Sequence, residues 1–223
     1  MDPGKLVGEA WAMYRAYWRH FVLISLAVFA AIALLTFLLA LLLGTVGVLA
    51  GGLISIVGIF WLQGALVEAV ADVRDGRADL TVGQTISRVR PRLNSLSLSG
   101  LLATLGVVAG LVLAVIPGLV LLTWWVLIVP VIVLEGTGVL GSFGRSRELV
   151  RGHGWSVFGV IVLTVALYVA GWIVVALALF WLPNGIRGFL TNVVGSTLTA
   201  PIVAISWTLM YYRLRSGREP AAA

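Results

Sequence analysis

Long uncharged apolar runs, separated by short polar stretches, dominate the pattern of the chain. A helix needs about 20 residues to cross the roughly 30 Å hydrocarbon layer of a bilayer. Six runs approach or exceed that length, and they predict spans at residues 21–43, 46–67, 93–116, 118–134, 157–182 and 189–212. Because a spanning segment must satisfy its own backbone, we predict an all-α polytopic membrane protein. It forms one integral domain, residues 1–223, with six transmembrane helices in three hairpins.

A second pattern precedes each predicted hairpin: apolar residues recur at three- and four-residue spacing, with basic residues off that stripe. The segments cover residues 4–20, 81–91 and 138–152. Each predicts an amphipathic helix lying in the headgroup plane of the membrane. Gly8, Gly83 and Gly141 occupy similar places in the three segments. Either the helix and hairpin together form a threefold repeat, or similar hydropathy alone produces the likeness.

Glycine and proline mark the expected turns and distortions. The Gly44-Thr45 pair leaves almost no loop between the first two spans, and Pro117-Gly118 predicts the turn between the third and the fourth. Pro130 and Pro201 fall near or within the fourth and sixth spans, so each predicts a helix kink. Proline also frees a backbone carbonyl, which a neighbouring group or water must satisfy.

Composition and charge predict where in the cell the protein lies and how it is oriented. Hydrophobic residues make up 61% and charged residues 11% of the sequence, and the mean hydropathy is +1.09, so the bilayer is the expected solvent. A net charge of +6 raises the question of nucleic acid. However, every Lys and Arg except Arg187 lies on one side of the predicted spans. The positive-inside rule therefore predicts a multi-pass protein of the cytoplasmic membrane, with both termini cytoplasmic and no nucleic-acid partner.

Two carboxylates are candidate functional groups, because Glu68 and Glu135 end the second and fourth predicted spans. In the structural interpretation they pair with arginines of the amphipathic segments and clamp the loop helix under the bundle. Arg145, Arg147 and Arg151 are the candidates near Glu135. In the functional interpretation, a carboxylate binds a cation or a proton in an inner cavity. The structural interpretation is favoured.

The arginines of the first two amphipathic segments are candidate lipid contacts. These residues are Arg15, Arg19, Arg88, Arg90 and Arg92. Each cation near an anionic leaflet contributes on the order of 1 kcal/mol, so the helices together would bind acidic headgroups. The alternative is that these arginines only set the orientation of the chain.

No catalytic, cofactor-binding or metal-binding constellation accompanies these groups. Cysteine is absent, His20 and His153 lack metal-ligand spacing, and no G-x-S-x-G elbow surrounds a serine. We therefore expect no enzyme activity and no cofactor. Asn192, Ser196 and Thr199 recur at four and three residues in the sixth span. Such residues either line a polar path or bond packed helices, and packing is favoured.

Residues 116–155 carry a resemblance to a known family. The order of features is Pro117-Gly118, an aromatic-containing apolar run, Pro130, Glu135, Ser146-x-x-Leu149-Val150-x-Gly152 and Trp155. It resembles the membrane domain attached to some glycerophosphoryl diester phosphodiesterases, and related six-helix membrane proteins of bacteria and archaea. The resemblance implies a stand-alone membrane domain. In that family the phosphodiesterase activity belongs to a separate soluble barrel, so no catalytic residue is carried over.

Three functions remain open from the sequence. The first is a non-enzymatic membrane protein whose basic helices contact anionic lipid, a protein partner or a second copy, and which affects membrane organisation or envelope homeostasis. The second is a small transporter, or a transporter subunit, that uses Glu68 or Glu135 in an inner cavity. The third is a membrane anchor or regulator for a separate lipid-modifying enzyme.

Overall fold

The computed structural model describes residues 2–74, 76 and 79–217. Arg77 and Arg218, two of the cations used to predict the orientation, lie outside the described residues. The all-α prediction is confirmed, because every regular element of the described chain is a helix. The elements are α1 (Pro3–Ala16), α2 (Trp18–Val73), α3 (Val82–Val89), η1 (Arg90–Arg92), α4 (Leu93–Leu113), α5 (Val115–Trp125), α6 (Ile128–Glu135), α7 (Val139–Val150), α8 (Gly154–Ala178) and α9 (Asn184–Ser216).

Five helical stretches in the described chain are long and apolar enough to cross a membrane. They are Trp18–Val73, Val82–Leu113, Val115–Glu135, Gly154–Ala178 and Arg187–Ser216. The first two predicted spans both fall inside α2. Its backbone is non-helical at Gly44, with φ 55° and ψ −129°. These lengths and compositions are those of a membrane protein.

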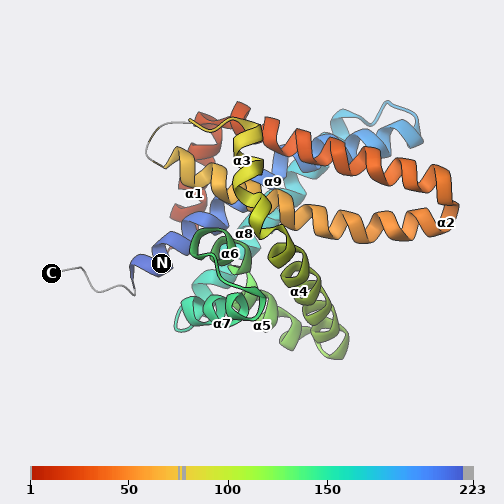
Figure 1. The fold of residues 1–223 in the computed structure, drawn as a ribbon. Coiled ribbons are helices and arrows are strands. Elements are labelled where there is room, and N and C mark those ends of the chain that lie inside the picture. Colours follow the sequence, from red (N-terminus) through yellow and green to blue (C-terminus); the bar gives the residue numbers. More distant parts are fainter. Residues whose placement is uncertain (1, 75, 77–78, 218–223) are drawn as a thin grey trace.

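The chain reverses direction at Gly44, as Figure 1 shows at the far end of α2. Only glycine adopts a positive φ without steric cost. Close packing of the two arms also needs small residues, because a Cβ on Gly47 would collide with the backbone carbonyl of Leu39. Further along, a Cβ on Gly51 would lie 3.2 Å from the Thr36 side chain. The two arms of α2 therefore lie antiparallel and in direct contact.

The second turn lies three residues earlier than predicted. Helix α4 ends at Leu113, and the extended residue Ala114 (φ −166°, ψ 148°) leads into α5. Pro117 instead occupies the first turn of α5, where its missing N–H has no helical acceptor to lose. Gly118 permits close packing, since its Cβ would lie 2.7 Å from the Leu111 backbone nitrogen. The predicted Pro117-Gly118 turn was therefore wrong in position.

The predicted amphipathic segments correspond to short helices. Helix α1 starts at the Asp2 cap and ends at Ala16, and the non-helical Tyr17 separates it from α2. Thr81 and Gln84 form a capping box at the start of α3. Pro91 lies in the single 3₁₀ turn η1, which joins α3 to α4.

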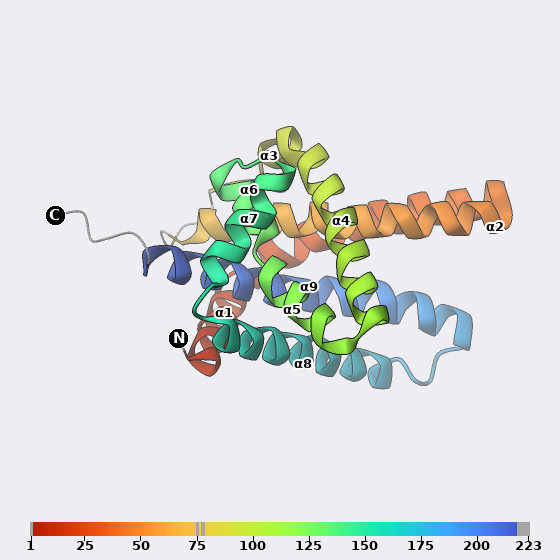
Figure 2. The same cartoon turned by 90° about the horizontal axis from the view of Figure 1, so that it is seen from below.

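The helices diverge from a common packed end. In Figure 2, α1 and the last turn of α9 lie at one end, and the Gly44 reversal and the α8–α9 connection lie at the other. Buried side chains gather where α1, α6, α7 and the inner parts of α2, α8 and α9 meet. By contrast, Leu42 is 76% exposed and Leu113 is 84% exposed. Apolar surface of this extent at the helix tips requires lipid or another protein to cover it.

Candidate functional site

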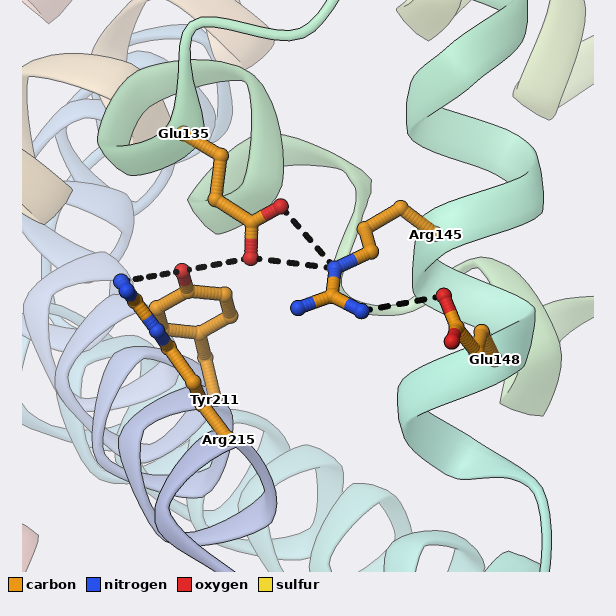
Figure 3. A network of polar contacts seen from close by, with 5 residues as sticks. All are labelled: Glu135, Arg145, Glu148, Tyr211 and Arg215. Carbon is orange, nitrogen blue, oxygen red and sulfur yellow. Dashed lines mark hydrogen bonds and ion pairs between the residues drawn. The ribbon is translucent and has the colours of Figure 1, made fainter. Parts of the chain in front are cut away.

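A polar network joins three helices around Glu135, the last residue of α6 (Figure 3). Arg145 of α7 donates from Nε to both carboxylate oxygens, at 3.3 and 3.0 Å. Tyr211 of α9 donates its hydroxyl to Oε1 at 2.8 Å, and Arg215 Nη1 donates to that hydroxyl oxygen at 3.4 Å. On the other side, Arg145 Nη1 bonds Glu148 at 3.0 Å. One carboxylate thus connects α6, α7 and α9.

The side chains at the centre of this network are largely buried, and the charge of Arg145 is stabilised. Tyr211 is fully buried, and the Glu135 side chain is only 17% exposed. Hydrogen bonds to Glu148 and Glu135 raise the pKa of Arg145, so the guanidinium stays cationic at any physiological pH. A partly buried carboxylate bonded by an arginine and a tyrosine is well compensated. The geometry is that of a clamp, and the predicted pairing of Glu135 falls on Arg145.

Ser146 repairs a break between α5 and α6. The helix is interrupted at Val126 and Leu127, and Pro130 lies in the first turn of α6. Proline cannot donate to the carbonyl four residues before it, which here belongs to Val126. The buried Ser146 hydroxyl of α7 accepts from the Leu127 N–H at 3.2 Å and donates to the Trp124 carbonyl at 2.6 Å. A neighbouring serine thus satisfies backbone groups exposed by the break.

Pro201 behaves differently from Pro130. Helix α9 runs without interruption from Asn184 to Ser216 with Pro201 inside it. The structure therefore shows a helix break near Pro130 and none at Pro201. Serine and threonine side chains of α9 bond the preceding turn, as Thr199 does to the Gly195 carbonyl at 2.7 Å.

The two other candidate arginines lie further along the chain, Arg147 within α7 and Arg151 directly after it. The Arg147 guanidinium lies over the Trp124 ring, 4.3 Å from its centroid, in a cation–π contact. Arg151 is the C-cap residue that follows α7. Both line an open cleft of about 640 Å³ between α7 and the start of α8, together with Trp124.

Glu68 forms a second clamp. Its carboxylate accepts from Arg92 at 3.3 Å, which ties the inner part of α2 to η1. The Glu68 side chain is 13% exposed. A further ion pair joins Glu9 of α1 to Arg213 of α9. The Arg74 guanidinium lies over the Tyr212 ring, 3.6 Å from its centroid.

The candidate lipid-contact arginines are mostly exposed. Arg15, Arg88 and Arg90 lie on the surface of α1, α3 and η1. Arg19 packs over Trp18, with 5.5 Å to the ring centroid. Arg92 is half-buried because it pairs with Glu68. Arg92 therefore differs from Arg88 and Arg90: it forms an ion pair with Glu68, whereas they are exposed.

The remaining polar candidates lie in α2, in α9 and at the start of α8. His20 is half-buried beside Phe21, whereas His153 is exposed at the start of α8. Within the described residues, no group of three or more His, Cys, Asp or Glu is placed to hold a metal ion. Thr199 packs against Gly171 of α8, while Asn192 and Ser196 face a cleft between α2, α8 and α9. That cleft has a volume of about 660 Å³.

Sequence reasoning missed three residues of the clamp region. Glu148 lies three residues after Arg145, a spacing at which helical charges meet, so this signal was available. Ser146 had no such signal, because the carbonyl that Pro130 leaves without its helical donor belongs to Val126, whereas Ser146 bonds backbone groups of Trp124 and Leu127. Tyr211 is 76 residues from Glu135 along the chain, and no local pattern announces their contact.

Comparisons of the chain with protein-family models, curated proteins and solved structures found no match. The resemblance of residues 116–155 to a phosphodiesterase-associated membrane domain therefore stays a prediction. Function has to be argued from the geometry of the described residues.

Proposed function

We propose that the chain is a non-enzymatic integral protein of the cytoplasmic membrane that contacts anionic lipid through its basic interfacial helices and so affects membrane organisation. The observation that carries the proposal is the distribution of cations. Among the described residues, every Lys and Arg except Arg187 lies in α1, α3, η1 or α7, in the first turn of α2 or the last turn of α9, or directly after α2 or α7. Positive charge at one end of an apolar bundle favours the cytoplasmic face.

Six membrane crossings in three hairpins are the second part of this proposal. The reversal at Gly44 supports it, because each arm of α2 exceeds the roughly 20 residues that a span needs. The pairs α4–α5 and α8–α9 supply the other two hairpins. The α5 arm is short, and α6 continues it past the break that Ser146 bridges. Both termini then lie on the cytoplasmic side.

Cysteine labelling tests the threading, because the natural chain has no cysteine. Gly83→Cys and Gly188→Cys form a matched pair, since a Cβ at either position meets no atom within 4 Å. In intact cells, an impermeant maleimide should label Gly188→Cys and leave Gly83→Cys unlabelled until the cells are permeabilised. Thr45→Cys should label from outside. Labelling of Gly83→Cys in intact cells would refute the proposed orientation.

A transport role is the second candidate, and the cleft between α2, α8 and α9 favours it. Thr36, Ser55, Tyr168 and Asn192 contribute polar atoms to its lining. Among the residues that the structure describes, no Asp, Glu, Lys or Arg lines this cleft, Glu68 and Glu135 included. The cleft suits a neutral solute and not ion coupling through those carboxylates. Solute flux into proteoliposomes, lost in an Asn192→Leu variant, would support this role.

A further inference from the structure

Two clefts of opposite character meet beside α7 and α8. The first is the cleft of about 640 Å³ that Arg147 and Arg151 line. The second, of about 650 Å³, runs between α5 and α8, and side chains such as Leu119, Val120 and Phe158 make it apolar. Trp124, Gly152 and Gly154 line both clefts, so the two clefts adjoin.

We infer that this joined groove holds one anionic phospholipid, with its phosphate beside Arg147 and Arg151 and an acyl chain along α5 and α8. The inference rests on the proposed function, because it requires the basic end of the chain to face a lipid leaflet. It goes further in assigning a defined site to one lipid molecule. An amphiphile matches a groove that is cationic at one end and apolar along the other.

The arginine-lined end of the groove suits an anion. Arg147 is held in place by stacking on Trp124, which leaves its N–H donors in the plane of the guanidinium available at the ring edge. Glu148 also lines this cleft, but its carboxylate is already paired with Arg145 at 3.0 Å. The local charge therefore remains positive and complements a phosphodiester.

The backbone at the start of α8 adds donors to the same place. Gly152 has φ +86°, and this tight turn brings the start of α8 to the cleft. Within the described chain no side chain caps this helix. Its first-turn amides have no acceptor within the helix, and the helix dipole favours negative charge there. These donors supplement the two arginines.

The apolar end matches an acyl chain. Its α5 wall runs from Trp124 to Ile116, which is about 12 Å at the rise of an α-helix. Trp155 is 89% exposed and extends this apolar surface beside Phe158. A soluble phosphate or phosphopeptide would leave that surface uncovered, whereas a phospholipid covers both ends of the groove.

Lipid titration of the purified full chain tests the site. Phosphatidylglycerol and phosphatidylcholine of equal chain length are added to the protein in neutral detergent, and bound lipids are counted by native mass spectrometry. The double variant R147Q/R151Q should weaken binding of the first phosphatidylglycerol by about thirtyfold, from two cations near the phosphate. The matched control R88Q/R90Q removes the same charge from exposed arginines of α3 and η1, and should change it less than threefold.

Two further variants separate charge from folding and shape. R147K/R151K keeps the charge but loses the guanidinium that stacks on Trp124, so it should weaken binding less than R147Q/R151Q does. An equal loss in the Lys and Gln variants would overturn the charge-based recognition of phosphate. Val120→Trp narrows the apolar cleft without changing charge and should weaken binding at least fivefold. Unchanged binding in this variant would overturn the acyl-chain assignment.

The remaining outcomes distinguish the site from the proposed function. Water-soluble glycerophosphoglycerol should not compete, and competition at equal concentration would show a phosphate site and refute the lipid. Equal effects of R147Q/R151Q and R88Q/R90Q on a real phosphatidylglycerol preference would overturn the site while leaving general lipid contact intact. Absence of any preference in the natural protein would overturn both.

Discussion

Replacing Ser146 with alanine removes a single oxygen atom but should destabilise the protein strongly. The Ser146 hydroxyl is fully buried and bonds both the Leu127 N–H, at 3.2 Å, and the Trp124 carbonyl, at 2.6 Å. Leu127 is itself fully buried, so water does not reach the freed amide. An unsatisfied buried donor costs about 1–3 kcal/mol, and a lost hydrogen bond about 0.5–1.5 kcal/mol. We expect the free energy of unfolding to fall by about 2–3 kcal/mol.

The magnitude distinguishes a repaired break from an ordinary contact. Hydrogen bonds between packed transmembrane helices contribute about 0.6 kcal/mol on average. Ser142→Ala is the matched control, because Ser142 is equally buried on the same helix and bonds only the Val139 carbonyl, at 2.6 Å. Its removal strands no donor and loses only a bond to the preceding turn of its own helix, which contributes little to helix stability, so the expected loss is below about 0.5 kcal/mol. Any gain in helix propensity is common to both variants.

Reversible unfolding in mixed micelles, with increasing SDS and tryptophan fluorescence as the signal, gives both free energies. The structural reasoning requires Ser146→Ala to lose at least about 1.5 kcal/mol more than Ser142→Ala. If the two variants agree within about 0.5 kcal/mol, the hydroxyl does not hold the α5–α6 break, and the interpretation of that break is wrong.

Three further perturbations follow from the packing. Glu135→Gln should cost about 1–2 kcal/mol, since the lost ion pair is partly exposed, and a double-mutant cycle with Arg145→Gln should recover most of it as coupling. Gly47→Ala should cost about 3 kcal/mol or more by forcing the arms of α2 apart, whereas Gly52→Ala, which meets no atom within 4 Å, should be neutral or stabilising. Burial raises the pKa of Tyr14, so the folded chain keeps that proton to higher pH than the unfolded chain and loses stability as pH rises above about 10. Tyr14→Phe should reduce this loss of stability at alkaline pH. It should also cost about 1 kcal/mol at pH 7, because it removes the hydrogen bond to the Leu198 carbonyl. Unfolding titrations at pH 7 and above pH 10 measure both effects, and an unchanged dependence of stability on alkaline pH would contradict this reasoning.

Hydropathy predicted the helices well because the bilayer allows few alternatives. A long apolar run in lipid must be helical to satisfy its backbone, so most helix positions followed from composition alone. The turn at Ala114 did not, since the residues on both sides of it are equally apolar. The turn was predicted at Pro117 because proline is compatible both with a turn and with the first turn of a helix, where the structure places it.

The candidate site was predicted in its residue types but not in its pairing. The sequence brought Glu135 close to three arginines, and the rotation of α7 decides which one it meets. Arg145 and Arg147 are two residues apart, which separates their directions by about 200° around a helix. Arg145 therefore reaches Glu135, while Arg147 stacks on Trp124. Only the packed position of α7 fixes that rotation, and local sequence patterns do not.

The repaired break and the proposed lipid groove depend on the same turn of chain. Ser146 fixes the Trp124 carbonyl, and the Trp124 ring supports the guanidinium of Arg147. In a continuous helix through residues 123–130, the Leu127 N–H would bond a carbonyl of the same helix and would not be available to Ser146. Pro130 prevents this by denying a donor to the carbonyl of Val126. The proline thus makes a helix end inside a span, and α7 uses that end to place a cation beside an apolar groove.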